Sequence, residues 1–325
     1  MKENVRRLIF KEKNFYDRGE YEMRKFQNGD RVCFVGDSIT HNGMFVNQII
    51  AYYRRHFPEE HIEFYNCGIA GGNLGNTIKI YDEDIALYAP THIVLMIGVN
   101  DSRRDHLNDP ADGKYDFLSA AYEGYRKNLE IFYNMTREMG VKLTLCTPAP
   151  YDEYGRYDAP AFRGGYALIM GYAELVRAFA RDNGLDLCDY HAEMTKVMQT
   201  EVLYAPDRIH PTETGHFVMA RTLLAAQGLE LSAPMKIDKE LEAWYDATQR
   251  IRNIIAAEFI LVPNYIELSH KERSAAIKKR LAEAENGTNP TDDYIRSLMH
   301  RHIANKPHQN EHVEFVKSFM KACRQ

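Results

Sequence analysis

Three residues of this chain have the types and the spacing that nucleophilic catalysis requires. Ser38 comes directly after an apolar run, Val32–Val35, and a Gly-Asp pair. Asp207 and His210 are three positions apart in a proline-flanked loop, close enough for the carboxylate to reach the imidazole ring. A serine hydroxyl becomes a strong nucleophile when a base removes its proton, and that base is usually a histidine oriented by a carboxylate. The sequence therefore predicts Ser38 as the nucleophile, His210 as the base and Asp207 as the acid that orients it.

Attack by a serine on a carbonyl carbon also needs donors for the negative charge that develops on the carbonyl oxygen. Gly71 lies in the glycine-rich segment 68–75, where a backbone N–H can approach a substrate with no side chain in the way. Asn100 follows the most apolar run of the chain and offers a side-chain amide. Together with the N–H of Ser38, these two groups form a predicted oxyanion hole.

The candidate residues follow segments that have the pattern of buried strands. Short apolar runs alternate with stretches of helical spacing, which is typical of a parallel sheet covered by helices on both faces. The carboxyl ends of parallel strands lie at one edge of the sheet, so the loops that carry these residues are expected to meet there. The predicted strands span 32–35, 62–67, 91–97, 141–146 and 185–189, and the predicted helices span 44–57, 77–88, 117–139, 166–183, 191–200 and 212–227, with a polar insertion at 102–116.

The pattern changes near residue 230, beyond which the spacing is helical and no strand is predicted. Helices are expected at 240–261, 271–284, 292–303 and 312–323. We therefore divide the chain into an N-terminal helical segment (1–30), an α/β domain (31–230) and a helical C-terminal extension (231–325). The apolar residues of the extension, Trp244 among them, predict either core packing or a contact between subunits of a homo-oligomer.

The composition narrows the class of partner and the compartment. The 325 residues carry a net charge of −5, whereas nucleic-acid-binding domains usually present a basic face, so no nucleic-acid partner is expected. No apolar run approaches the ~18 residues of a membrane span, and residues 1–10 lack the apolar core of a signal peptide. Free thiols and a cytoplasmic location are expected, because the cysteines show no paired spacing. They are Cys33, Cys67, Cys146, Cys188 and Cys323.

Four segments together resemble the conserved blocks of the SGNH (GDSL-type) hydrolases, in the order of that family. They are Gly36-Asp37-Ser38, the glycine loop with Gly71, Gly98-Val99-Asn100-Asp101, and Asp207-Arg208-Ile209-His210. The resemblance covers residues 30–228. It implies a three-layer α/β/α, flavodoxin-like fold and ester hydrolysis through an acyl-enzyme, without metal or organic cofactor.

The same resemblance assigns a role to each of the matching residues. Ser38, His210 and Asp207 become the catalytic triad, and the N–H groups of Ser38 and Gly71 with the side chain of Asn100 become the oxyanion hole. The first block carries isoleucine where the family has leucine. Gly72 follows Gly71 directly, so the identity of the oxyanion glycine stays open by one residue.

Substrate contacts are expected in the loops around Ser38, from Asp37, Arg103 and Tyr151. Tyrosines in the loop after 141–146 could line a sugar-binding cleft, or the loop could simply be solvated. The resemblance favours a small acyl group, such as acetyl on a carbohydrate, as the substrate's acyl part. His41, just past the nucleophile, is expected at the surface, with a substrate contact as the alternative.

Two other functions remain compatible with the residues. An acyltransferase would use the same serine and pass the acyl group to a sugar instead of water. A non-catalytic binding or assembly protein would keep the fold and use its C-terminal helices. No metal is expected at the histidines of the extension, because no cysteine or carboxylate set completes a tetrahedral site. They are His300, His302, His308 and His312.

Overall fold

The computed structural model of the chain describes residues 23–109, 111–262, 268, 270–285 and 293–322. Its centre is a five-stranded sheet in the order β2-β1-β3-β4-β5, in which all neighbouring strands are parallel. The α/β fold expected from the sequence is confirmed, and every strand end lies within one residue of its prediction. The strands are β1 (Arg31–Gly36), β2 (Glu63–Gly68), β3 (His92–Met96), β4 (Lys142–Cys146) and β5 (Asp186–Cys188).

The register of the three strands at β1 aligns their carboxyl ends. Gly36 of β1 pairs with Gly68 of β2 on one side and with Met96 of β3 on the other. Ser38 follows this row by two residues, Gly71 by three and Asn100 by four. Because β1 lies between its two partners, the loop that carries Ser38 is flanked by the loops that carry Gly71 and Asn100.

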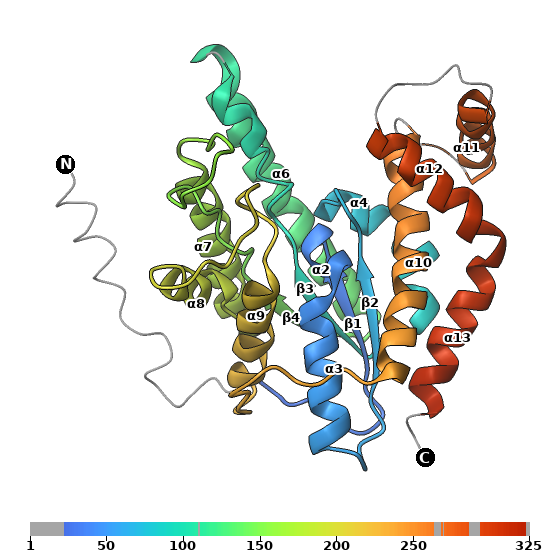
Figure 1. Cartoon of the computed structure of the whole chain (residues 1–325). Coiled ribbons are helices and arrows are strands. Elements are labelled where there is room, and N and C mark those ends of the chain that lie inside the picture. The colour runs from blue at the N-terminus through green and yellow to red at the C-terminus, as the bar shows by residue number, and fades with distance from the viewer. Residues whose placement is uncertain (1–22, 110, 263–267, 269, 286–292, 323–325) are drawn as a thin grey trace.

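Helices cover both faces of the sheet, as Figure 1 shows. On one face α3 packs against α9, and α4 contacts α6 on the other. The helices of this part are α2 (Ser38–Asn42), α3 (Met44–His56), α4 (Leu74–Lys79), α5 (Tyr81–Asp84), α6 (Ala111–Glu138), α7 (Gly165–Asn183), α8 (Tyr190–Val197) and α9 (Glu213–Ala226), with short 3₁₀ helices η1 (Ala86–Tyr88) and η2 (Arg104–Asn108).

Two predictions, one for a helix and one for the polar insertion, need correction. The single helix expected over 77–88 is broken into α4, α5 and η1. Its break at Ile80 places Asp84 where Arg252 binds it, a long-range ion pair that local spacing cannot foretell. The polar insertion over 102–116 is η2 followed by the first turns of α6, which is 28 residues long.

The C-terminal extension is helical, as predicted, and lies beside β2 in Figure 1. Its long helix α10 packs against both α12 and α13. A buried ion pair joins α10 to α5, with the two guanidinium nitrogens of Arg252 at 2.7 and 2.6 Å from the carboxylate of Asp84. The elements are α10 (Lys239–Leu261), α11 (His270–Glu285), α12 (Asp293–Asn305), η4 (Lys306–His308) and α13 (Gln309–Ala322).

The remaining structural predictions concern the N-terminus, the thiols and membrane spans. Residues 1–22 lie outside the described part, and 23–30 form no helix, although Met23 and Phe26 are buried. Four cysteines are buried and free, and Cys323 lies outside the described residues. Across the described ranges, no helix has both the length and the apolar character needed to span a membrane.

Candidate active site

Ser38 is the first residue of α2, and only Asp37 separates it from Gly36 at the carboxyl end of β1. Asp37 caps this helix, since its carboxylate accepts a hydrogen bond from the N–H of Ile39 at 3.0 Å. The turn requires glycine at position 36, because a Cβ on Gly36 would collide with the main-chain carbonyl of Met96. The tight connection holds Ser38 at the sheet edge, at a helix N-terminus where backbone N–H groups lack intrahelical acceptors.

The structure brings the three predicted triad residues into one hydrogen-bonded chain. Ser38 Oγ lies 2.7 Å from Nε2 of His210, and Nδ1 of the same ring lies 2.7 Å from Oδ2 of Asp207. The second oxygen of Asp207 accepts hydrogen bonds from the N–H groups of Ile209 and His210, both at 3.0 Å. A carboxylate held at Nδ1 leaves Nε2 as the nitrogen that can take the serine proton.

The surroundings of Asp207 keep its carboxylate charged. Partial desolvation alone would raise the pKa of Asp207, but the N–H of His210, its ring and the N–H of Ile209 outweigh it and hold that pKa below its ordinary value. The carboxylate therefore stays ionised and can stabilise the imidazolium formed during attack. The side chains of His210 and Asp207 are 47% and 50% exposed, so the triad is open to solvent from one side.

The oxyanion donors predicted from the sequence follow the neighbouring strands. Gly71 has φ +76°, and no atom lies within 4 Å of where its Cβ would be, so its main chain is accessible. The N–H of Gly72 instead donates to the carbonyl of Ile69 at 2.9 Å and is used within the turn. This geometry favours Gly71 as the oxyanion glycine. Asn100 Nδ2 donates to the Gly72 carbonyl at 2.8 Å, and its second hydrogen remains for a ligand.

Asp101 joins the two oxyanion loops. Its Oδ1 accepts a hydrogen bond from the N–H of Leu74, at the start of α4, at 3.0 Å. Burial raises the pKa of Asp101 to about 7, and the nearby carboxylate of Asp37 adds to the effect. The main-chain oxygen of Asp101 accepts from the hydroxyl of Tyr172 at 3.2 Å. Asp101 thus has a structural role beside Asn100, which it helps to hold in place.

Arg208, between the acid and the base, links the triad loop to the loop over 151–164. Its guanidinium is buried and donates to main-chain carbonyls of that loop, including Gly155 at 2.9 Å and Ala159 at 2.7 Å. The N–H of Asp152 donates to the carbonyl of Arg208 at 3.0 Å. The backbone of Arg208 is left-handed, with φ +69°. The sequence did not reveal this linking role of Arg208, because the main-chain carbonyls that it binds leave no signature in the sequence.

The predicted substrate contacts are only partly compatible with the structure. Asp37 is buried, and burial raises its pKa to about 6, so its side chain caps α2 and does not face a substrate. Tyr151 is also buried, with its hydroxyl accepting from the N–H of Phe162 at 2.9 Å. The burial and the hydrogen bonds of these two side chains give them a structural role in this structure. Arg103 is half-exposed and binds the ring of His106 at 2.7 Å.

His41 was expected at the surface, and the structure corrects this. Its Nδ1 accepts a hydrogen bond from the N–H of Ala70 in the glycine loop at 3.3 Å. Burial, together with the charge of Arg252, lowers its pKa to about 4. The contacts come from a loop and a helix far away in the sequence, so no local pattern around His41 signals them.

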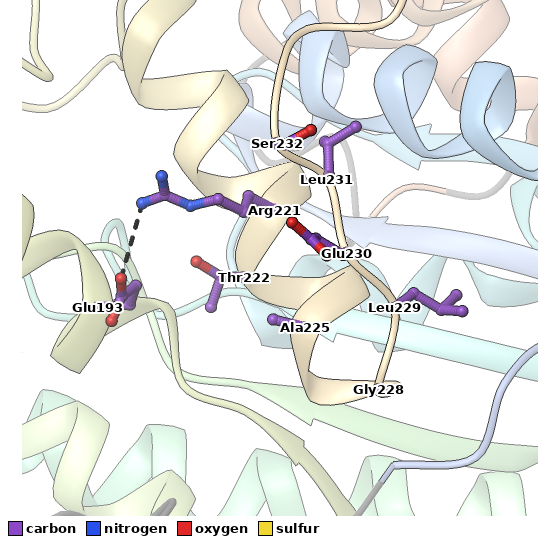
Figure 2. A pocket seen from close by; sticks show the side chains of 9 residues that line it. All are labelled: Glu193, Arg221, Thr222, Ala225, Gly228, Leu229, Glu230, Leu231 and Ser232. Carbon is purple, nitrogen blue, oxygen red and sulfur yellow. Dashed lines mark ion pairs between the residues drawn. The ribbon is translucent and has the colours of Figure 1, made fainter.

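A pocket of about 540 Å³, drawn in Figure 2, contains none of the triad residues in its lining. It is formed by the last turns of α9, the segment after it and Glu193 of α8, whose carboxylate lies 3.7 Å from Arg221. The triad loop precedes the N-terminus of α9, so the pocket is about 15 Å further along the helix axis. Its lining residues are Glu193, Arg221, Thr222, Ala225, Gly228, Leu229, Glu230, Leu231 and Ser232.

The described residues include no group of three or more His, Cys, Asp or Glu side chains that could hold a metal ion. His302, considered from the sequence, is buried and lies 3.1 Å from the carboxylate of Glu258, which also binds Lys306 at 2.5 Å. This cluster is an ion-pair network inside the extension.

Solved structures share this fold over different lengths. BT4096, a gut microbial diltiazem-metabolizing enzyme, superimposes with a TM-score of 0.69 at 17% identity and covers 92% of this chain and 97% of its own, a span that takes in the C-terminal helices. LAE5, an alpha/beta hydrolase enzyme from the metagenome of Lake Arreo, has a TM-score of 0.54 at 27% identity and covers 64% of this chain and 99% of its own.

A protein of known activity and a protein family also match this chain by sequence. An acetylxylan esterase of Geobacillus stearothermophilus is 26% identical over 223 residues, which make up 63% of this chain and 97% of that protein. The structure of Axe2, an acetylxylan esterase from the same organism, has a TM-score of 0.53 at 23% identity and covers 64% of this chain and 100% of its own. Residues 34–217, more than half of the chain, match the GDSL-like Lipase/Acylhydrolase family. The chain belongs to this family of acylhydrolases, as its four sequence blocks predicted.

Proposed function

We propose that this esterase hydrolyses short-chain esters, in particular acetyl esters of carbohydrates, through an acyl-enzyme on Ser38. The observation that carries the proposal is the continuous chain from Ser38 Oγ through His210 to Asp207, with both contacts at 2.7 Å. It stands at the edge where the oxyanion loops of two adjacent strands flank the serine.

The reaction follows from these positions. His210 Nε2 takes the proton of Ser38 as its oxygen attacks the ester carbonyl. The negative charge on the carbonyl oxygen is stabilised by the N–H groups of Ser38 and Gly71 and by the side chain of Asn100. His210 then protonates the leaving alcohol, and the same residues use water to release the acid.

The surface around the triad supports a short acyl group. A long acyl chain gains about 0.8 kcal/mol for each CH₂ that it buries, and it needs apolar surface for this. Among the described residues, no large hydrophobic side chain is exposed in α2, in 69–73, in 98–102 or in 204–210. The half-exposed triad leaves room for a bulky alcohol part, and the acetylxylan esterases among the relatives act, by their name, on such substrates.

Tyr154 is the candidate for a sugar contact. Its side chain is 80% exposed on the loop that Arg208 attaches to the triad segment. A flat aromatic ring that carries a polar hydroxyl can pack against a sugar and still be hydrated. Tyr154→Ala is therefore expected to raise KM for acetylated xylo-oligosaccharides severalfold and to leave KM for para-nitrophenyl acetate unchanged.

The central experiment compares wild type and Ser38→Ala on para-nitrophenyl acetate, butyrate and octanoate and on acetylated xylo-oligosaccharides. We expect wild-type rates to fall with acyl length, free acetate to appear from the sugar substrate, and Ser38→Ala to lose roughly 10⁴-fold or more in kcat. Transfer of the acetyl group to an added sugar, without release of acetate, would instead indicate an acyltransferase.

Ser232→Ala is the matched control, because Ser232 is exposed at the distant pocket of Figure 2. This variant should keep wild-type kinetics. Full activity in Ser38→Ala, or faster hydrolysis of octanoate than of acetate, would contradict the assignment of the nucleophile or of the acyl group, respectively.

A further inference from the structure

One face of α10 in the C-terminal extension supplies donors to the helix that carries Ser38. The hydroxyl of Tyr245 donates to the carbonyl of Asn42 at 2.8 Å. The side-chain amide of Gln249 donates to the carbonyl of His41 at 2.7 Å and lies 3.2 Å from that of Asn42. Tyr245, Gln249 and Asn253 are spaced by four residues, so they lie along one side of α10.

These hydrogen bonds are made to the last two residues of α2, which is a very short helix. Helix α2 has five residues, and the last carbonyls of any helix have no intrahelical partner. The carbonyls of His41 and Asn42 receive that partner from α10. Ser38 is the first residue of α2, so the orientation of this helix determines where the nucleophile lies.

The side chain of His41 extends the connection to the oxyanion loop. Its Nδ1 accepts a hydrogen bond from the N–H of Ala70, the residue before Gly71, and the main-chain carbonyl of the same residue accepts from the side chain of Gln249 of α10. Because burial lowers the pKa of His41 to about 4, the ring is neutral at pH 7 and Nδ1 can serve as an acceptor. One residue therefore joins α2, the glycine loop and α10.

We propose that His41 is a positioning residue, held at its main-chain carbonyl by Gln249 of α10, and that its ring fixes the oxyanion loop relative to the nucleophile. The C-terminal extension thereby becomes part of the catalytic apparatus. This inference rests on the proposed function, since it concerns the same serine and the same oxyanion hole. It predicts a loss in the chemical step, because a misplaced donor weakens stabilisation of the transition state more than binding of the ester.

The test measures kcat and KM for para-nitrophenyl acetate in His41→Leu, His41→Asn and Gln249→Ala. His41→Leu should lower kcat by roughly 10- to 100-fold with KM changed less than about threefold. Asn can place an acceptor oxygen near the position of Nδ1, so His41→Asn should recover most of the activity. Gln249→Ala should lower kcat less, and its effect should be smaller in the His41→Leu background, because it acts by holding His41 in place.

Asp246→Ala is the control on the same helix, because Asp246 is exposed beside Tyr245, and it should keep the wild-type kcat. A folded His41→Leu with wild-type kcat, or a Gln249→Ala effect that is equal in both backgrounds, would overturn the inference. If His41→Leu does not fold, then wild-type kcat in Gln249→Ala overturns it. Failure of the wild type to hydrolyse any ester would overturn the proposed function instead, a result distinct from all of these.

Discussion

The buried carboxyl of Asp101 should make the stability of the protein depend on pH in an unusual direction. Burial raises its pKa to about 7, while the same group in an unfolded chain has a pKa of ~3.9. Its Oδ2 is buried without a hydrogen-bond partner among the described residues. Between these two pKa values the folded protein holds a proton that the unfolded chain has lost. The free energy of unfolding must therefore fall as pH rises from about 4 to about 7.

The size of this effect follows from the two pKa values. Each pH unit in this interval changes the free energy of unfolding by about 1.4 kcal/mol per proton, which gives roughly 4 kcal/mol over the whole interval. Asp101→Asn keeps the oxygen that accepts from Leu74 and removes the titration. The unfolding free energy of the variant minus that of the wild type should therefore increase by about 3 kcal/mol between pH ~4.5 and pH ~8.

Urea unfolding followed by circular dichroism at several pH values measures this difference. Asp82→Asn is the control, because Asp82 is exposed on α5 and its carboxylate is in water in both states. The reasoning is refuted if the difference between Asp101→Asn and wild type is constant across the pH range, whatever its absolute value.

Four further predictions concern the site and its supports. Asn100→Ala should lower kcat on para-nitrophenyl acetate by about 10²- to 10³-fold with little change in KM, and a change in KM alone would exclude an oxyanion role. Asp207→Asn should lower kcat by up to about 10⁴-fold, because the ring of His210 is then held in the wrong tautomer, and an unchanged pH–rate profile would contradict this. Arg208→Ala should lower the free energy of unfolding by about 2–4 kcal/mol, since buried main-chain carbonyls lose a charged donor; urea unfolding tests it. Arg252→Ala should cost about 3–5 kcal/mol in the same assay by leaving the Asp84 carboxylate buried and unpaired, and a loss below 1 kcal/mol would contradict that burial.

The parts of the fold that the sequence predicted are those with local causes. An apolar run bounded by glycine or polar residues ends where the strand ends. Gly36 therefore marked the edge of the sheet, and Ser38 just beyond it was recognised as the candidate nucleophile. Parallel connectivity then required the loops after β1, β2 and β3 to share that edge. The triad geometry agrees with the prediction, because Asp207 and His210 are close in the chain and depend on no distant register.

The parts that escaped prediction depend on contacts with main-chain atoms or on distant residues. The choice between Gly71 and Gly72 needed the turn in which the Gly72 N–H is used by Ile69. The bonds from Arg208 to carbonyls of 152–159 involve acceptors that every residue carries, so no residue type marks them. The prediction that His41 lies at the surface failed for the same reason, since the partners of this residue are a backbone N–H and a helix more than 200 residues away.

The position of α10 explains how one added helix can affect both stability and chemistry. Strand β2 is at the edge of the sheet, and an uncovered edge presents unpaired main-chain groups that proteins commonly protect with a helix. Helix α10 lies beside this edge, and its buried Arg252 ties it to α5. Gln249, which precedes Arg252 by about one turn on the same helix, donates to main-chain carbonyls of α2, and α2 itself contacts β2. A helix that covers the edge of the sheet is thus also within reach of the nucleophile's helix, and the Gln249→Ala and Arg252→Ala variants can separate the two roles: the first should change kcat, and the second chiefly the free energy of unfolding.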